Sequence, residues 1–150
     1  MTPDTEQRPL RILVVDDNDD DVILLQESFK DHPSVELVKV ARDGEEALAY
    51  LRREGIFDGV QRPGLVLLDI NMPRKNGFEV LGAMRSDPAL RSIPVVILST
   101  SRREVDVVEA YTGGACSFVS KPVNFDRLKM MAEHFVRYWS TVARIPEIES

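Results

Sequence analysis

Residues 10–17, LRILVVDD, decide the fold of this chain, because a short apolar run rich in β-branched residues ends there in two aspartates. Such a run is typical of a strand that is buried on both faces of a parallel sheet. Four further segments predict strands of the same sheet. They are 35–41 (VELVKVA), 65–68 (LVLL), 94–98 (PVVIL) and 117–120 (SFVS).

Apolar residues at helical spacing occupy most of the stretches between these strands. Asp43 and Asn124 stand where helix N-caps are expected, and Ser101 forms a capping-box pair with Glu104. The glycine pair at 113–114 ends one helix. Strands that alternate with helices predict an α/β fold, a doubly wound five-stranded parallel sheet with flanking helices on both faces.

Length and composition restrict what the chain can be. It has 150 residues, a formal net charge of −6 and one cysteine, Cys116. We therefore expect one domain, no intrachain disulfide and no binding to a nucleic-acid backbone. No apolar run approaches the ~20 residues of a membrane span, and residues 1–9 lack a secretory signal. These features predict a cytoplasmic protein with a flexible N-terminus (1–9), one domain (10–143) and a tail (144–150).

Polar residues that can carry chemistry follow four of the five predicted strands. Asp16 and Asp17 follow the first, Asp69 the third, Ser99 the fourth and Lys121 the fifth. The carboxyl ends of parallel strands meet at one edge of an open sheet, where ligands bind. A single polar residue after a strand commonly belongs to a solvated turn. That explanation does not account well for five such residues at the same edge of the sheet.

The three aspartates of this set predict a cation site. Carboxylates about 4 Å apart repel each other by about 4 kcal/mol per pair, so either one is protonated or a cation lies between them. Carboxylates without His or Cys select a hard cation, and Mg²⁺ suits a sparse site because it keeps waters and binds phosphate oxygens. With Lys121 as a counter-charge for an anion and Ser99 as a hydroxyl donor, the set fits phosphoryl transfer to an aspartate.

A calcium-binding loop is a competing interpretation of the first acids. Asp16, Asn18, Asp20 and Glu27 match the spacing of that loop. However, Asp21 stands where the loop needs glycine for its sharp turn, and a strand rather than a helix precedes it. We therefore reject a calcium sensor.

Taken together, the motifs resemble a known family. Asp16 and Asp17 after the first strand, Asp69 within LLDINMPRKNG, Ser99 after PVVIL and Lys121 within FVSKP are similar to the receiver domain of bacterial response regulators. The resemblance extends from residue 10 to the final helix. It implies the flavodoxin-like strand order 2-1-3-4-5, two-component signal transduction and a sensor histidine kinase as partner.

The resemblance also implies a role for each matching residue. Asp69 is the implied phosphorylation site, which attacks the phosphohistidine of the kinase, and Lys121 is implied to pair with the phosphoryl group. Asp17 is an implied direct ligand of Mg²⁺ and Asp16 a ligand through water. Asp69 and the backbone carbonyl of Asn71 complete the implied metal site.

Two further residues are implied to act as a switch. Ser99 bonds a phosphoryl oxygen, and Phe118 reports phosphorylation to the face formed by the fourth helix, fifth strand and fifth helix. Phe118 lacks the hydroxyl of the tyrosine found elsewhere in the family, so we expect a weaker or purely steric switch. Thr100 replaces a usual Ala or Gly, so we expect narrower access to the phosphoryl group. The bond before Pro122 is often cis in this family, which would help to aim Lys121.

A narrower resemblance concerns the loop 55–64, the LSTS segment at 98–101 and the aromatic tail with Tyr138 and Trp139. These features are similar to small standalone receivers that partner bacterial phytochrome kinases. We therefore expect a phytochrome-type sensor kinase as partner, no output domain, and a homodimer through the face named above. The apolar stripe of Met130, Met131 and residues 135–139 is either a dimer or partner surface or ordinary core packing.

Hypotheses of other functions remain open from the sequence. The chain could be a phosphorelay intermediate, or a receiver-like protein that binds partners without phosphorylation, although the complete set of Asp69, Ser99 and Lys121 disfavours the latter. A true aspartyl-phosphate hydrolase normally carries a second Asp two residues after its nucleophile as general acid. Asn71 stands there and cannot donate that proton. We therefore expect no enzyme activity beyond the chain's own phosphorylation and dephosphorylation.

Overall fold

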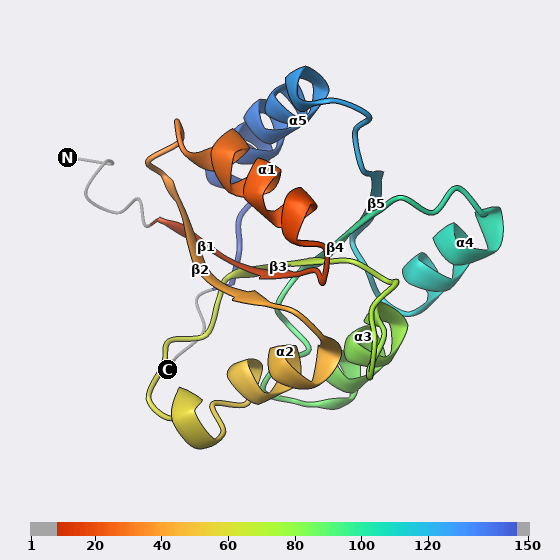
Figure 1. The fold of residues 1–150 in the computed structure, drawn as a ribbon. Helices are drawn as coiled ribbons and strands as arrows, with labels where there is room; N and C mark the ends of the chain where they lie inside the picture. Colours follow the sequence, from red (N-terminus) through yellow and green to blue (C-terminus); the bar gives the residue numbers. More distant parts are fainter. Residues whose placement is uncertain (1–8, 147–150) are drawn as a thin grey trace.

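The computed structural model describes residues 9–146. Strands and helices alternate along the chain, as the apolar pattern predicts (Figure 1). In chain order the elements are β1 (Leu10–Val15), α1 (Asp19–Phe29), β2 (Val35–Ala41), α2 (Gly44–Leu51), the 3₁₀ turn η2 (Gly55–Phe57), β3 (Leu65–Leu68), α3 (Gly77–Ser86), β4 (Val95–Ser99), α4 (Glu104–Thr112), β5 (Ser117–Ser120), α5 (Phe125–Arg137) and the π-helical turn η3 (Tyr138–Val142).

The five strands form one parallel sheet in the order β2-β1-β3-β4-β5. The predicted fold class and strand order are therefore confirmed. β1 and β3 lie next to each other in the middle of the sheet, although about 50 residues separate them in the chain. This pairing brings the residues after β1 beside the residue after β3.

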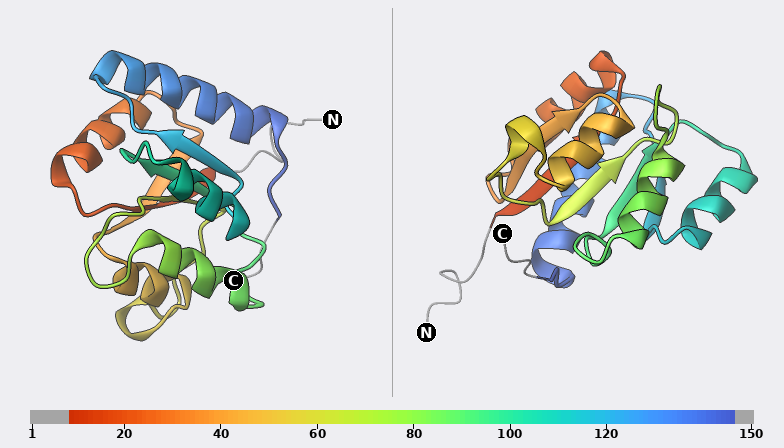
Figure 2. Two further views of the ribbon diagram at one scale, coloured as in Figure 1. Left: turned by 90° about the vertical axis from the view of Figure 1, so that its right-hand side faces the viewer. Right: turned by 90° about the horizontal axis from the view of Figure 1, so that it is seen from below.

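The sheet has helices on both faces (Figure 2). Helices α1 and α5 cover one face, and α2, α3 and α4 cover the other. Along β1, Ile12 and Val14 pack toward α1 and α5, whereas Leu13 and Val15 pack toward the opposite layer. Because alternate residues of a strand point to opposite faces, a central strand with two buried faces needs a continuous apolar run.

Helix starts follow the expected capping residues with one exception. Asp43 and Asn124 each accept a hydrogen bond from a backbone N–H in the first turn of α2 and α5. The predicted capping box of Ser101 and Glu104 is wrong, because α4 starts after Arg103 without a side-chain cap. The Ser101 hydroxyl instead donates to the carboxylate of Asp106.

The chain beyond residue 143 also touches the core. Ile145 is partly buried and packs against the cluster between the sheet, α1 and α5. Among the described residues, no helix combines the length and the apolar character needed to cross a membrane.

Candidate functional site

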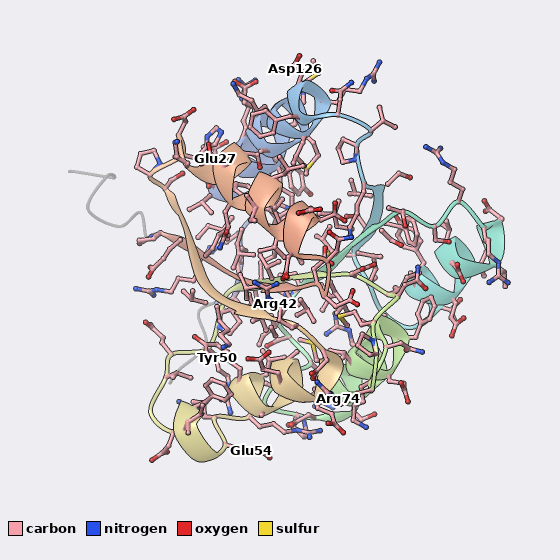
Figure 3. The ribbon with its side chains drawn as sticks, viewed as in Figure 1. Glu27, Arg42, Tyr50, Glu54, Arg74 and Asp126 are labelled. Atoms are coloured by element: carbon pink, nitrogen blue, oxygen red, sulfur yellow. The ribbon has the colours of Figure 1, made fainter. Side chains whose placement is uncertain are left out.

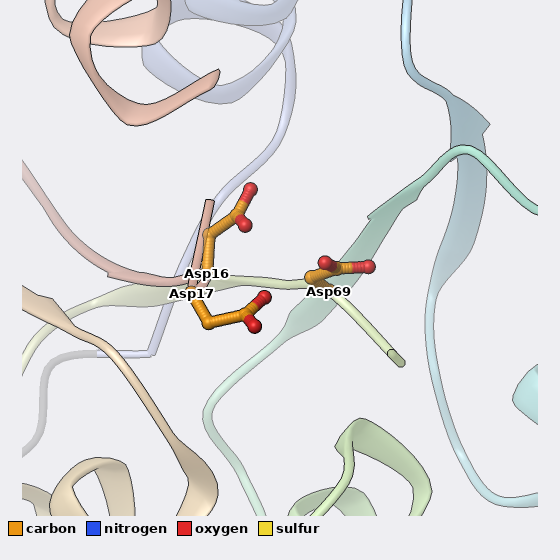
Figure 4. A group of neighbouring side chains, drawn as sticks. All are labelled: Asp16, Asp17 and Asp69. Atoms are coloured by element: carbon orange, nitrogen blue, oxygen red, sulfur yellow. The ribbon is translucent and has the colours of Figure 1, made fainter. Parts of the chain in front are cut away.

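Three carboxylates gather at the carboxyl ends of β1 and β3 (Figure 4). Asp16 and Asp17 follow β1 directly and Asp69 follows β3, so the pairing of these two strands places all three at one edge. One oxygen from each lies within 4.8 Å of the others. Asp16 and Asp69 are only 4% and 7% exposed, whereas Asp17 is exposed. The site is therefore shielded from solvent at Asp16 and Asp69 and open to solvent at Asp17.

Lys121 reaches this cluster from the loop after β5. Its Nζ lies 2.8 Å from Asp16 Oδ2, 2.9 Å from Asp21 Oδ2 and 3.5 Å from Asp69 Oδ2. Burial lowers the pKa of Lys121, but its hydrogen bonds to Asp16 and Asp21 outweigh burial and raise the pKa above its ordinary value. Lys121 is thus a permanent cation at the site. The peptide bond before Pro122 is trans, since residues 9–146 contain no cis peptide bond, and the expected cis geometry is wrong.

Among the carboxylic acids with a resolved shift, Asp69 alone has a raised pKa, whereas those of Asp43 and Glu46 are lowered. Burial is the main cause that raises the pKa of Asp69 from 3.8 to about 6, against the opposing effect of Lys121, and the neighbouring charge of Asp16 adds to the rise. The N–H of Asn71 lies 3.3 Å from Asp69 Oδ1, and donates to it. Asp69 is therefore ionised in most molecules near neutral pH, but its charge is poorly compensated.

Ser99 is fully buried at the last position of β4, one residue beyond the predicted end of that strand. Its Oγ accepts a hydrogen bond of 3.1 Å from the N–H of Ser101. This contact occupies one lone pair of the hydroxyl and leaves the hydroxyl proton free to donate. Thr100, the next residue, is exposed.

Comparisons with known proteins agree with this geometry. A sequence model of the response regulator receiver domain matches residues 12–133. This chain belongs to that family. It is 35% identical over 143 residues to the response regulator Rcp1 of Synechocystis, covering 95% of this chain and 97% of Rcp1.

Solved receiver structures share the whole architecture. The phosphorylated cyanobacterial phytochrome response regulator RcpA has a TM-score of 0.88 and 39% identity, covering 93% of this chain and 99% of that one. The Mn²⁺-bound form of Rcp1 has a TM-score of 0.84 and 35% identity, covering 93% and 100%. RPA3017, a response regulator in red light signalling of R. palustris, has a TM-score of 0.84 and 31% identity, covering 93% and 99%.

The acidic cluster of this receiver fits a divalent cation. Ligand oxygens on opposite sides of an octahedral Mg²⁺ are about 4 Å apart, so carboxylates whose oxygens lie within 4.8 Å of one another can converge on one ion through small side-chain rotations. All three donors are carboxylate oxygens, which hard divalent cations prefer. A relative that binds Mn²⁺ has the same fold.

The loop of the receiver that carries Asp69 is shaped by close backbone contacts. A Cβ atom on Gly77 would lie 2.4 Å from the carbonyl oxygen of Asp69, and one on Gly44 would lie 2.3 Å from the carbonyl oxygen of Lys75. The N–H groups of these two glycines donate to the carbonyls of Ile70 and Lys75. Only glycine allows both approaches, so the loop packs closely against the first residue of α3 and the first residue of α2.

An ion pair reinforces the same loop. Arg74, which is labelled in Figure 3, has a positive φ of 63°. Its Nε and Nη2 donate to Asp43 Oδ2 with N–O distances of 3.0 and 2.6 Å. A hydrogen bond from the Glu46 N–H holds the pKa of Asp43 below its usual value, and Arg74 adds to this effect against the opposing effect of burial. Sequence reasoning assigned Asp43 only a capping role and missed Arg74 and Asp21, because these contacts join residues far apart in the chain.

Phe118 lies on β5 and is half-buried against the layer that contains α3 and α4. Its backbone N–H donates to the hydroxyl of Tyr111 on α4, with an N–O distance of 3.2 Å. The aromatic hydroxyl that position 118 lacks is therefore present nearby, on the adjacent helix. Trp139 is partly buried and packs against the layer of α1 and α5, with its ring centroid 6.4 Å from that of Phe135.

Proposed function

We propose that Asp69 accepts a phosphoryl group from the phosphohistidine of a sensor kinase, with Mg²⁺ at the acidic cluster. The observation that carries this proposal is the arrangement of Asp69 itself, a buried carboxylate beside two further carboxylates and the ammonium of Lys121. Its pKa of about 6 leaves it ionised, and thus nucleophilic, near neutral pH. Mg²⁺, when bound, supplies positive charge that offsets the charge of the phosphoryl oxygens.

The residues of the chain would each contribute one part of the transfer. An Asp69 oxygen attacks phosphorus, the bond between phosphorus and the histidine nitrogen breaks, and the electron pair of that bond leaves with the imidazole. Lys121 stabilises the negative charge of the phosphoryl oxygens, and the free hydroxyl proton of Ser99 can donate to one of them. Asp16, Asp17, Asp69 and the carbonyl of Asn71 would hold the cation.

Intact-mass measurement tests this proposal. We expect the wild-type chain to gain one phosphoryl group from a small-molecule phosphodonor in the presence of Mg²⁺, and to lose it in base. Asp69→Asn is expected to gain none. An unchanged wild-type mass, or equal labelling of both proteins, would contradict the assignment of Asp69.

We propose a phytochrome-type histidine kinase as the phosphodonor. The support comes from relatives: RcpA is a phytochrome response regulator, and RPA3017 belongs to red light signalling. Radiolabel transfer to this chain should be faster from a phytochrome kinase than from a kinase of an unrelated sensory class, with Asp69→Asn as the blank. Equal rates from both kinases would refute the phytochrome assignment without touching phosphoryl acceptance.

We further propose homodimerisation through the face of α4, β5 and α5. Exposed apolar side chains gather on these elements and on the loop between them, and they are Val105, Val108, Tyr111, Val123 and Met130. Trp139 is a poor probe of this face because its side chain packs against the apolar cluster between the sheet, α1 and α5. Val108→Glu should lower the sedimentation coefficient at high protein concentration, and an unchanged value would rule this face out.

A further inference from the structure

Lys121 forms ion pairs with three carboxylates. Two of them would also hold a cation, and the third would not. Asp16 Oδ2 and Asp69 Oδ2 lie 2.8 and 3.5 Å from Lys121 Nζ, and both carboxylates belong to the acidic cluster. Asp21 Oδ2, at 2.9 Å, is the third partner and lies outside that cluster. The ammonium and a divalent cation would therefore share the carboxylates of Asp16 and Asp69, and Asp21 is the partner of Lys121 that they do not share.

Burial makes that third partner important. The side chain of Lys121 is only 10% exposed, whereas that of Asp21 is 37% exposed. A buried ammonium that loses its carboxylate partners is strongly destabilised, because water cannot replace them. When a cation takes Asp16 and Asp69, Asp21 is the remaining carboxylate in contact with Lys121 among the described residues.

The backbone of α1 holds Asp21 in position. Asn18 caps this helix, and its side-chain oxygen accepts a hydrogen bond of 2.9 Å from the Asp21 N–H. Asn18 is itself tied to the site, because its N–H donates to Asp16 Oδ1 at 2.9 Å. The carboxylate of Asp21 therefore starts from a backbone position that is fixed relative to the cluster.

We propose that Asp21 is a positioning residue for the phosphoryl-accepting site: it holds Lys121 on the α1 side of the cluster, so that a divalent cation can bind without leaving the ammonium unpaired. This inference rests on the proposed function, since it concerns the same site. It adds a residue that acts through Lys121 and touches neither the cation nor the phosphoryl group.

The test is a titration of the metal-free, full-length chain with Mn²⁺ alone. Binding is measured from the loss of the electron paramagnetic resonance signal of free Mn²⁺. Asp21→Asn should weaken Mn²⁺ binding by about threefold to tenfold, a coupling typical of residues in direct contact. Asp20→Asn is the matched control, because Asp20 lies in the same helical turn, is exposed and forms no ion pair within residues 9–146. It should change the affinity by less than about twofold, as expected for a screened surface charge.

A double-mutant cycle separates the contact from a general charge effect. In a Lys121→Met background, Asp21→Asn should have no larger effect than Asp20→Asn, because there is no ammonium left to hold. Asp21→Glu should restore part of the wild-type affinity. The inference fails if Asp21→Asn and Asp20→Asn are equivalent in the wild-type background, if the effect of Asp21→Asn persists without Lys121, or if the wild type binds no Mn²⁺.

The outcome is independent of phosphoryl acceptance. A wild-type chain that shows this Mn²⁺ pattern but gains no phosphoryl group would refute the proposed function and leave the role of Asp21 intact. A chain that is phosphorylated on Asp69 but shows equal Mn²⁺ affinities for the two asparagine variants would do the reverse.

Discussion

Replacing Asp69 by Asn should stabilise the metal-free protein above neutral pH. Burial raises the pKa of Asp69 from 3.8 to about 6, so folding favours the protonated form and the ionised form is a cost to the native state. Between these two values the folded state binds more protons than the unfolded state, and stability falls as the pH rises. The full cost, reached above about pH 7, corresponds to about 3 kcal/mol.

Urea unfolding in the presence of a chelator measures this cost. With a slope of about 1–3 kcal/mol per molar urea, Asp69→Asn should raise the midpoint at pH 8 by about 1–3 M. The gain should shrink steadily toward pH 4, where both forms of the protein are neutral at this position in the folded state. Asp58→Asn, which alters an exposed carboxylate, should leave the midpoint nearly unchanged.

Adding Mg²⁺ should reverse the order, because the cation stabilises the wild type by binding the folded state and finds one ligand fewer in Asp69→Asn. Equal or lower stability of Asp69→Asn than of the wild type at pH 8 without metal would refute the reasoning, since it would mean that Lys121 fully compensates the buried charge.

Three further predictions concern the loop after β3, the cap of α2 and the packing of Trp139. Gly77→Ala should unfold at lower temperature and accept phosphoryl groups more slowly, because its Cβ would lie 2.4 Å from the Asp69 carbonyl oxygen, whereas Gly82→Ala, with open space around it, should be more stable by about 1 kcal/mol. Asp43→Ala should cost about 1–2 kcal/mol at pH 7 in chemical unfolding; since the pKa of Asp43 is lowered in the fold, this loss should fade as the pH falls below about 4. Trp139→Ala should lower the thermal stability while leaving the sedimentation coefficient unchanged, and a change in self-association would show that this residue faces a second copy.

The strand and helix pattern was predictable because each element carries its own signal. The bounds predicted for β1, β2, β3 and β5 match the structure, and the caps at Asp43 and Asn124 are present. The start of α4 was not predictable in the same way. The Ser101 hydroxyl donates to Asp106 instead of capping α4. A short sequence motif does not show which of two such local hydrogen bonds forms.

The sequence alone determined which acids meet, because buried parallel strands need continuous apolar runs and their carboxyl ends share one edge of the sheet. It could not determine that Asp21 also contacts Lys121, since the two residues are 100 positions apart and approach only when α1 packs beside the loop after β5. Nor could it set the pKa of Asp69, which depends on burial and on distances of a few ångströms. Such quantities arise from packing between elements, and only the tertiary structure decides them.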